Sequence, residues 1–326
     1  MQLAGILEPL DVKGLEFKNR IVMPPMYTGL ATSEGAVTEE LIEHYVQRSR
    51  ALGLIIIEHS FVVREGRLGQ RQLGCDNDSS ITGLERLSSS IHASGVPVVL
   101  QINHAGRSAN PDITGSQPVG PSPNGTVREL KVDEIKKIVR RFAEGVERAM
   151  RAGFDGAEIH GAHGFLLNQF LSPLTNHRTD QYGGSLENRI RFPLEVVEEV
   201  RSKVGGRLLL YRLGSDDLDP QGIHIKQSQK FAVKLEEAGI DIIDVSGGLC
   251  GSRPAELQDV QGYFVPQAQK IKEVVEVPVI GVGGIKDPEY ADELVLGGKV
   301  DLVAVGRSLF KDSEWAKKAI QKLRGR

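Results

Sequence analysis

The sequence predicts an α/β protein, a (β/α)8 barrel of the TIM type with an N-terminal β-hairpin that closes its bottom. Short apolar runs rich in β-branched residues alternate with amphipathic segments along the chain. Continuous apolar runs without strict alternation are typical of strands that are covered on both faces. Eight such runs predict strands at residues 21–26, 54–58, 97–102, 156–161, 208–213, 241–246, 278–283 and 302–306.

The segments between these runs have helical periodicity. In residues 133–150 the apolar side chains are spaced by three or four, and Asp133 and Glu134 lie in the first turn, where the helix dipole favours anions. Several segments end in a glycine shortly before the next strand, and glycine supplies the left-handed cap that returns the chain to the sheet. The other predicted helices are residues 39–51, 81–94, 186–204, 224–238, 265–274, 288–296 and 313–323.

Residues 7–17 have the pattern of a hairpin, with Lys13-Gly14 at its turn. Eight β/α units joined by right-handed crossovers close into a barrel. A doubly wound open sheet is the alternative, but eight evenly spaced units suit closure better. No composition shift or linker marks a boundary, so we expect a single barrel domain over residues 1–326.

Composition excludes several classes of function. A net charge of -3 and an isoelectric point of about 6.3 give no basic surface for nucleic acid or an anionic membrane. No apolar run approaches the roughly 18 residues that span a bilayer, and the first ten residues do not resemble a signal peptide. Cys75 and Cys250 are too few for a disulfide framework. We therefore expect a cytoplasmic protein without a nucleic-acid or membrane partner.

Polar, cationic or glycine residues follow nearly every predicted strand. The active sites of parallel barrels lie at the carboxyl ends of the strands, so these residues should surround one pocket. Gly283, Gly284 and Gly306 would let backbone N–H groups approach an anion, as at a phosphate site, although they could serve only as tight turns. The residues at the strand ends are Pro24, Pro25, Met26, Tyr27, His59, Gln101, His104, His160, His163, Arg212, Gly248, Gly283, Gly284, Gly306 and Arg307.

His160 and His163 admit three interpretations. With a third ligand such as His104 they could bind a metal, but no carboxylate lies at ligand spacing, so we predict no metal site. They could also be two structural histidines. The interpretation we favour is a pair of hydrogen-bond donors that hold and polarise a substrate carbonyl or anion.

These residues lie in segments that resemble the Old Yellow Enzyme family of flavin-dependent ene-reductases. The similarity extends over essentially the whole chain, and the stretch from His160 to Arg189 is highly specific. The segments that carry it are residues 19–26, Gln101 with residues 104–107, and residues 160–164, 168–173 and 176–189.

The resemblance implies non-covalent FMN, NADH or NADPH as hydride donor, and a small enone or enal as acceptor. It places Gln101 and Arg212 at the flavin's pyrimidine edge, the glycines of the last two strands at the phosphate, and His160 and His163 on the substrate carbonyl. The cofactor contacts that it implies are Pro24, Pro25, Met26, Gln101, Arg212, Gly248, Gly283, Gly284, Gly306 and Arg307.

Three features depart from the family. Phe165 replaces the tyrosine that usually protonates the substrate, which leaves Tyr27, Tyr263 or water as the acid. Tyr27-Thr28 replaces a flavin-tuning Cys or Thr and is similar to the barrel domain of dienoyl-CoA reductases, although without a cysteine cluster we expect no iron–sulfur segment. In small members of the family, a C-terminal tail places an arginine in the active site of the neighbouring subunit. The end of this sequence does not match that tail. Whether Arg324 or Arg326 completes the site of a partner in a dimer or tetramer is therefore left open.

The leading hypothesis for function is therefore an FMN-dependent ene-reductase that uses NADH or NADPH. An FMN-dependent oxidase or diaphorase that passes electrons to oxygen, a quinone or a protein is the alternative, and Phe165 favours it. A phosphate-binding lyase or isomerase without flavin is a third possibility, but no lysine lies at a strand end to form a Schiff base. A non-catalytic flavin-binding protein is the fourth.

Overall fold

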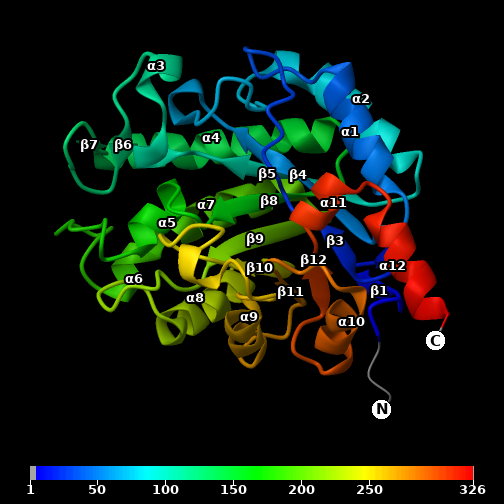
Figure 1. The fold of residues 1–326 in the computed structure, drawn as a ribbon. Coiled ribbons are helices and arrows are strands. Elements are labelled where there is room, and N and C mark those ends of the chain that lie inside the picture. The colour runs from blue at the N-terminus through cyan, green and yellow to red at the C-terminus, as the bar shows by residue number, and fades with distance from the viewer. Residues whose placement is uncertain (1–4, 326) are drawn as a thin grey trace.

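The computed structural model describes residues 5–325, and eight parallel strands form a closed barrel at its centre (Figure 1). The last strand pairs with the first, which confirms the predicted barrel and excludes the open sheet. The predicted strand at residues 21–26 ends early, because Pro24 and Pro25 have no N–H to continue the pairing. The barrel strands are β3 (Ile21–Met23), β4 (Leu54–Phe61), β5 (Val98–Asn103), β8 (Gly156–Gly161), β9 (Leu208–Gly214), β10 (Ile242–Ser246), β11 (Val279–Gly281) and β12 (Leu302–Ala304).

The N-terminal hairpin closes the bottom of the barrel, as predicted. It consists of β1 (Leu10–Val12) and β2 (Leu15–Phe17), which pair antiparallel. Lys13 and Gly14 form the turn with φ of 56° and 80°, the left-handed values that a two-residue hairpin turn requires. Phe17 is fully buried and packs in one cluster with the first residues of several strands, among them Leu54 and Leu208.

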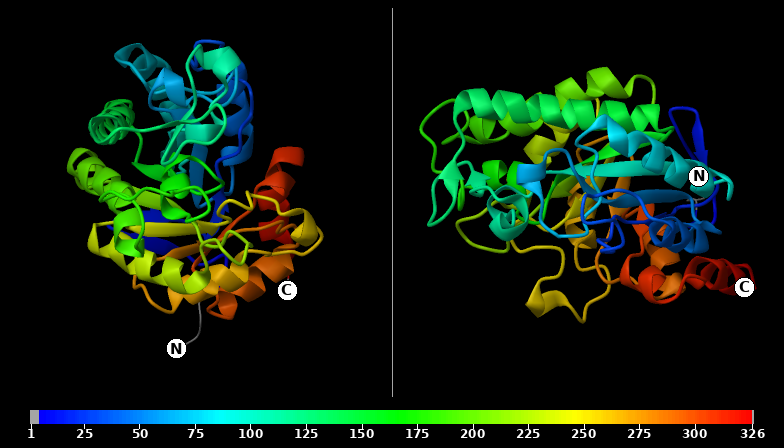
Figure 2. Two further views of the ribbon diagram at one scale, coloured as in Figure 1. Left: turned by 90° about the vertical axis from the view of Figure 1, so that its left-hand side faces the viewer. Right: turned by 90° about the horizontal axis from the view of Figure 1, so that it is seen from above.

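Helices surround the barrel on its outside (Figure 2). Each predicted helix is present, but residues 186–204 form two helices that meet at Ile190. The longer helices are α1 (Glu39–Ser49), α2 (Ile81–His92), α4 (Val132–Arg151), α7 (Arg191–Val204), α8 (Ile225–Glu237), α9 (Val265–Lys272), α10 (Pro288–Leu296) and α12 (Trp315–Arg324). The first of the two helices in residues 186–204 is α6 (Leu186–Arg189). The sequence pattern does not reveal the short elements α3 (Pro111–Thr114), α5 (Leu166–Leu171), α11 (Arg307–Lys311), β6 (Val119–Gly120) and β7 (Arg128–Glu129).

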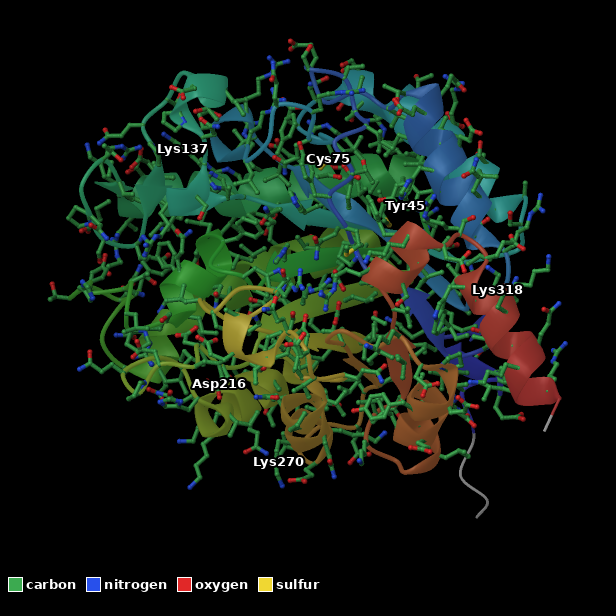
Figure 3. The ribbon with its side chains drawn as sticks, viewed as in Figure 1. Tyr45, Cys75, Lys137, Asp216, Lys270 and Lys318 are labelled. Carbon is green, nitrogen blue, oxygen red and sulfur yellow. The ribbon has the colours of Figure 1, made fainter. Side chains whose placement is uncertain are left out.

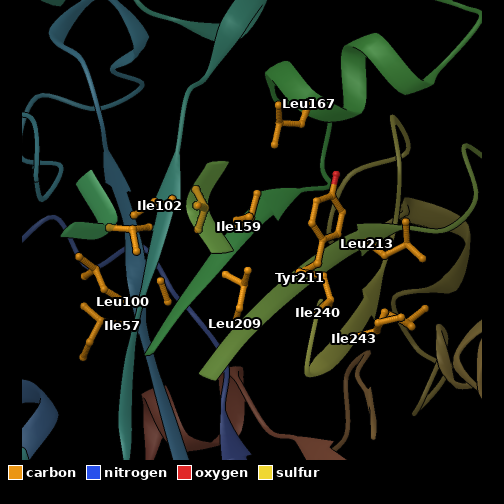
Figure 4. Close-up of a cluster of buried hydrophobic side chains, with 14 of the residues drawn as sticks. Ile57, Leu100, Ile102, Ile159, Leu167, Leu209, Tyr211, Leu213, Ile240 and Ile243 are labelled. Carbon is orange, nitrogen blue, oxygen red and sulfur yellow. The ribbon is translucent and has the colours of Figure 1, made fainter. Parts of the chain in front are cut away.

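Alternate residues along each strand face outward to the helices and inward to the barrel axis. Outward residues such as Ile57, Leu209 and Tyr211 belong to the large core between strands and helices (Figure 4). Inward residues near the start of the strands, such as Leu54 and Leu208, form a second apolar cluster. The barrel is therefore filled from the bottom by apolar side chains.

The same alternation makes the upper interior of the barrel polar. On β9, Leu208 and Leu210 face inward, and the next residue on that face is Arg212. Inward positions on four other strands carry Glu58, Gln101, Glu158 and Asp244, all of them buried. These five side chains form a polar layer directly beneath the carboxyl ends of the strands.

Most charged side chains lie on the surface of the molecule, and neither cysteine forms a disulfide. Lys137, Lys270 and Lys318 are exposed, whereas Tyr45 and Cys75 are buried; Figure 3 labels all five. Cys75 and Cys250 are both free thiols. Within residues 5–325, every helix is too short or too polar to cross a bilayer.

Candidate active site at the mouth of the barrel

Buried charges and amides in the polar layer hold one another in place. The Gln101 Nε2 atom donates a hydrogen bond to Glu158 Oε1 at 2.7 Å. Arg212 Nη1 lies 3.4 Å from Asp244 Oδ2, and these two residues are paired across β9 and β10. A buried guanidinium requires such a partner, because an unpaired charge in the interior is strongly unfavourable.

The polar layer contains more carboxyl groups than cations. Burial raises the pKa of Glu158 well above its usual value, and the nearby Asp244 raises it further, while Arg212 lowers it. Burial also raises the pKa of Asp244, again opposed by Arg212. Glu158 and Asp244 are close to each other and share one guanidinium, so they resist ionising together. We therefore expect these two carboxyl groups to retain one proton between them.

Several buried polar atoms of this layer lack a partner, and they suit the pyrimidine edge of a flavin. Gln101 Oε1 and Arg212 Nε are both buried without a hydrogen bond. Because Glu158 accepts from the Gln101 amide nitrogen, the Gln101 oxygen is left to accept from an N–H group. Arg212 can donate to a carbonyl oxygen or an anion. An isoalloxazine ring presents both kinds of group along one edge, so these residues fit FMN.

A cavity of about 330 Å³ opens beside this layer. It is lined by Pro24, Met26, Arg212, Gly283, Gly284, Gly306 and Arg307, all of which the sequence predicts as cofactor contacts. Three more cations, Arg253, Lys286 and Lys311, line it with one carboxylate, Asp259. An excess of positive charge is what a phosphate group needs.

Glycine is required on the wall of this cavity. Gly283 and Gly284 have φ of 119° and 65°, which side-chain-bearing residues rarely adopt. A Cβ atom on Gly283 would lie 2.8 Å from Tyr263, and one on Gly306 would lie 3.0 Å from the sulfur of Met26. A side chain at Gly283 would therefore collide with Tyr263, and one at Gly306 would require Met26 to shift, so glycine keeps this wall free of side chains.

The two predicted catalytic histidines lie beside each other at the end of β8, with ring centroids 5.0 Å apart. His160 Nδ1 accepts a hydrogen bond from Ala162 N at 3.2 Å, which leaves its proton on Nε2. His163 Nε2 lies 2.7 Å from Ser246 Oγ, and Ser246 lines the cavity. Burial lowers the pKa of both histidines well below the usual value, and the charge of Arg212 lowers both further. Both are therefore neutral donors at neutral pH.

Comparison with known proteins agrees with this geometry. Residues 5–325 match the model of the NADH:flavin oxidoreductase / NADH oxidase family. The chain belongs to that family. FMN is its cofactor, and the predicted resemblance to the Old Yellow Enzyme group is confirmed.

Similar proteins in the family include enzymes named for both nicotinamides. An NADH oxidase from Thermoanaerobacter brockii is 44% identical over 321 residues, which is 94% of this chain but 49% of that protein. An NADPH dehydrogenase from a Geobacillus species is 36% identical over 98% of this chain and 94% of its own length. An Old Yellow Enzyme homologue from Zymomonas mobilis has a TM-score of 0.86 at 27% identity, covering 98% of this chain and 93% of that one. The chain thus spans about half of the first relative and nearly all of the other two.

Other predicted site residues of this family member lie around the same mouth. Pro25 follows Pro24, and Tyr27 is 43% exposed with its ring stacked on His59. A Cβ atom on Gly248 would lie 2.2 Å from Asp217 Oδ1, so its glycine is needed for packing. Tyr263, the second candidate acid, lies at the phosphate end and donates its hydroxyl proton to Ser252 O. The direct roles of these residues stay predictions.

The remaining candidates, His104 and Arg324, do not line the cavity. His104, the third metal ligand considered, is buried and accepts from Gly106 N through Nδ1. Within residues 5–325 no cluster of three His, Cys, Asp or Glu residues is arranged to bind a metal ion. Arg324 ends α12 and is exposed, and Arg326 lies outside the described residues.

Sequence reasoning missed Asp244, Lys286 and Lys311, and it found His59 without its orientation. Asp244 is signalled by a carboxylate in an apolar strand, at the inward position after Ile242. Lys286 and Lys311 give no such signal, because they reach the cavity from loops and a short helix. His59 was visible as a strand-end residue, but its direction depends on a bulge that the pattern does not show.

Gly284→Ala should weaken FMN binding by about tenfold or more, because its Cβ atom would lie 3.0 Å from Arg307 Nη2. Gly298→Ala is the matched control, since Gly298 has the same φ of 65° but open space around it. Both variants should lose about 1 kcal/mol of stability from the left-handed backbone. Fluorescence titration with FMN measures the difference, and equal affinities in the two variants would contradict the assigned phosphate site.

Glu58→Gln should remove a pH dependence of stability. Burial raises the pKa of Glu58 to about 7, opposed by its hydrogen bond from Thr28. The folded state thus binds more protons than the unfolded state between about pH 4.5 and 7, and this stability is lost as pH rises through 7. Urea unfolding measures the free energy of unfolding of wild type and of the variant. The difference between the two should fall by about 2–3 kcal/mol from pH 5 to pH 8. With the exposed Glu16→Gln as control, a constant difference across this range would refute the assignment.

Proposed function

We propose that this protein is an FMN-dependent oxidoreductase that takes a hydride from NADH or NADPH and reduces the C=C bond of α,β-unsaturated carbonyl compounds. The observation that supports it most directly is the pair of neutral imidazole donors, His160 and His163, next to a cavity that fits FMN. Family membership supports the cofactor and the electron donor. The likeness to an Old Yellow Enzyme homologue supports the acceptor class.

FMN supplies the hydride chemistry when it is bound, and the chain supplies binding, orientation and polarisation. Gln101 and Arg212 would hold the pyrimidine edge, and Gly283, Gly284 and Arg307 the phosphate. His160 Nε2 would donate to the substrate carbonyl oxygen. His163 would donate through Nδ1, with Ser246 Oγ donating its hydroxyl proton to His163 Nε2. Neutral donors fixed in a water-poor site stabilise negative charge that develops on that oxygen, which makes the conjugated β-carbon electrophilic.

Phe165 replaces the tyrosine that protonates the α-carbon in the family that this chain resembles. Phe165 is 9% exposed, and it packs against Ala105 and Ala109 and against the ring of His160 at 4.8 Å. Its ring has no acidic proton to give. We infer that Tyr27, whose ring lies at the mouth, or solvent supplies the proton.

A second candidate function is an NAD(P)H oxidase or diaphorase. Phe165 favours it, because oxygen and quinones take their protons on oxygen and need no acid positioned over a carbon atom. The NADH oxidase among the similar proteins supports it as well. A cytoplasmic location, expected from the composition, and assembly as a dimer or tetramer both stay predictions.

The proposed function is tested by anaerobic half-reactions of the FMN-loaded protein. NADH or NADPH should bleach the visible flavin absorbance, and 2-cyclohexenone should restore it. The double variant His160→Ala, His163→Ala should still be bleached but should be reoxidised roughly 10²-fold more slowly by the enone, because both carbonyl donors are lost. Reoxidation by oxygen or benzoquinone but not by the enone would favour the second function, and no bleaching would contradict both.

Phe165→Tyr should raise enone turnover by about tenfold or more. The added hydroxyl restores an acid at the end of a ring that contacts His160, and general acid catalysis contributes about 10²–10⁴-fold. Steady-state assays with 2-cyclohexenone measure the gain, and the rate with oxygen serves as control and should change little. If enone turnover does not rise, another group already donates the proton.

A further inference from the structure

A β-bulge in β4 turns His59 toward the active-site mouth. The register between β4 and β5 pairs Ile57 with Leu100 and then Ser60 with Ile102. Two residues, Glu58 and His59, therefore lie opposite the single inward-facing Gln101. Such a bulge re-aims a side chain that would otherwise face the outer helices. The freed backbone N–H of Glu58 donates instead to the Tyr45 hydroxyl at 2.9 Å.

Gln72 fixes which nitrogen of His59 carries the proton. The Gln72 Oε1 atom accepts hydrogen bonds from the backbone N–H groups of Leu68 and Gly69, which sets the orientation of its amide. Its Nε2 atom lies 2.8 Å from His59 Nδ1 and also donates to His59 O at 3.1 Å. His59 Nδ1 must therefore accept, and the proton of the neutral ring lies on Nε2.

The His59 ring belongs to the same cluster as the predicted catalytic residues. Its centroid lies 6.4 Å from that of His160, 5.7 Å from Phe165 and 5.6 Å from Tyr27, on which it stacks. The side chain is 7% exposed, so the cluster holds it in place. Nothing in the chemistry proposed above uses this third imidazole.

His59 is suited to donate a hydrogen bond rather than to transfer a proton. Burial lowers the pKa of His59 to about 4, and the charge of Arg212 lowers it further. The imidazolium form is therefore scarce at neutral pH, and the neutral N–H is a weak acid. A buried neutral N–H of fixed direction is, however, a selective donor, because a ligand that leaves it unpaired loses affinity.

We propose that His59 is a specificity-determining residue whose Nε2–H donates to a second acceptor oxygen of the substrate. His160 and His163 would hold one carbonyl, and His59 would hold another on the far side of the alkene. The site would then prefer alkenes flanked by two carbonyl groups, such as cyclic imides and quinones, over simple enones. This inference rests on the proposed function, because it requires the first carbonyl to bind at His160 and His163.

The experiment compares two ligands that differ in one carbonyl group, succinimide and 2-pyrrolidinone, with the FMN-loaded protein. Neither is reducible at a C=C bond, so the dissociation constants follow from the change in flavin absorbance or from calorimetry without turnover. His59→Phe removes the donor but keeps an aromatic ring for Tyr27. His59→Gln keeps an N–H group near the position of Nε2. Melting temperature and FMN content show that each variant is folded and loaded.

His59→Phe should weaken succinimide binding about tenfold and leave 2-pyrrolidinone binding unchanged, and His59→Gln should recover most of the loss. The ratio of kcat/KM for maleimide to that for 2-cyclohexenone should fall by a similar factor in His59→Phe. Equal effects on both ligands, or no effect on succinimide, would overturn the role of His59 while leaving the proposed function intact. If wild type binds neither ligand although it is loaded with FMN, the carbonyl site itself is wrong.

If His59→Phe does not fold or load, Gln72→Met provides a second test. This variant removes the amide that fixes the proton of His59 on Nε2, but leaves the imidazole in place. Succinimide should then bind more weakly while 2-pyrrolidinone is unaffected. Unchanged selectivity in a folded, loaded Gln72→Met protein would also overturn the proposal.

Discussion

The ion pair between Arg212 and Asp244 is the interaction on which the candidate site depends. It lies inside the barrel, and the two residues are neighbours in the register of β9 and β10. A guanidinium in this position requires a carboxylate partner, and the partner fixes where its remaining N–H groups point. The positive charge of Arg212 also lowers the pKa of His59, His160 and His163, which helps to keep all three neutral. One buried cation thus serves both the cofactor edge and the substrate donors.

The two-residue repeat of the strands explains how a stable barrel can carry so polar a site. Inward positions near the bottom are apolar and are closed off by Phe17, whereas the next inward positions carry Glu58, Gln101, Glu158, Arg212 and Asp244. The apolar layers stabilise the fold, and the polar layer leaves unpaired atoms where a ligand can satisfy them. The buried polar groups destabilise the folded state, and the apolar packing beneath them offsets that cost.

The fold and the residues at the strand ends could be predicted from the sequence because both follow from local patterns. Apolar runs, glycine caps and the positions of His160, His163, Arg212 and Gly283 are visible without knowing which segments meet. The direction of His59 could not be predicted, since it depends on a one-residue mismatch between β4 and β5 and on Gln72 from a separate loop. The contribution of Lys286 and Lys311 to the cavity likewise depends on how distant segments pack.

A crystal structure of the protein with FMN bound tests the central claim most directly. The account predicts the pyrimidine edge of FMN against Gln101 Oε1 and the Arg212 guanidinium, and its phosphate among Gly283, Gly284 and Arg307. FMN bound with its phosphate at the Arg212 end, or a mouth filled by protein side chains with the flavin held elsewhere, would contradict it.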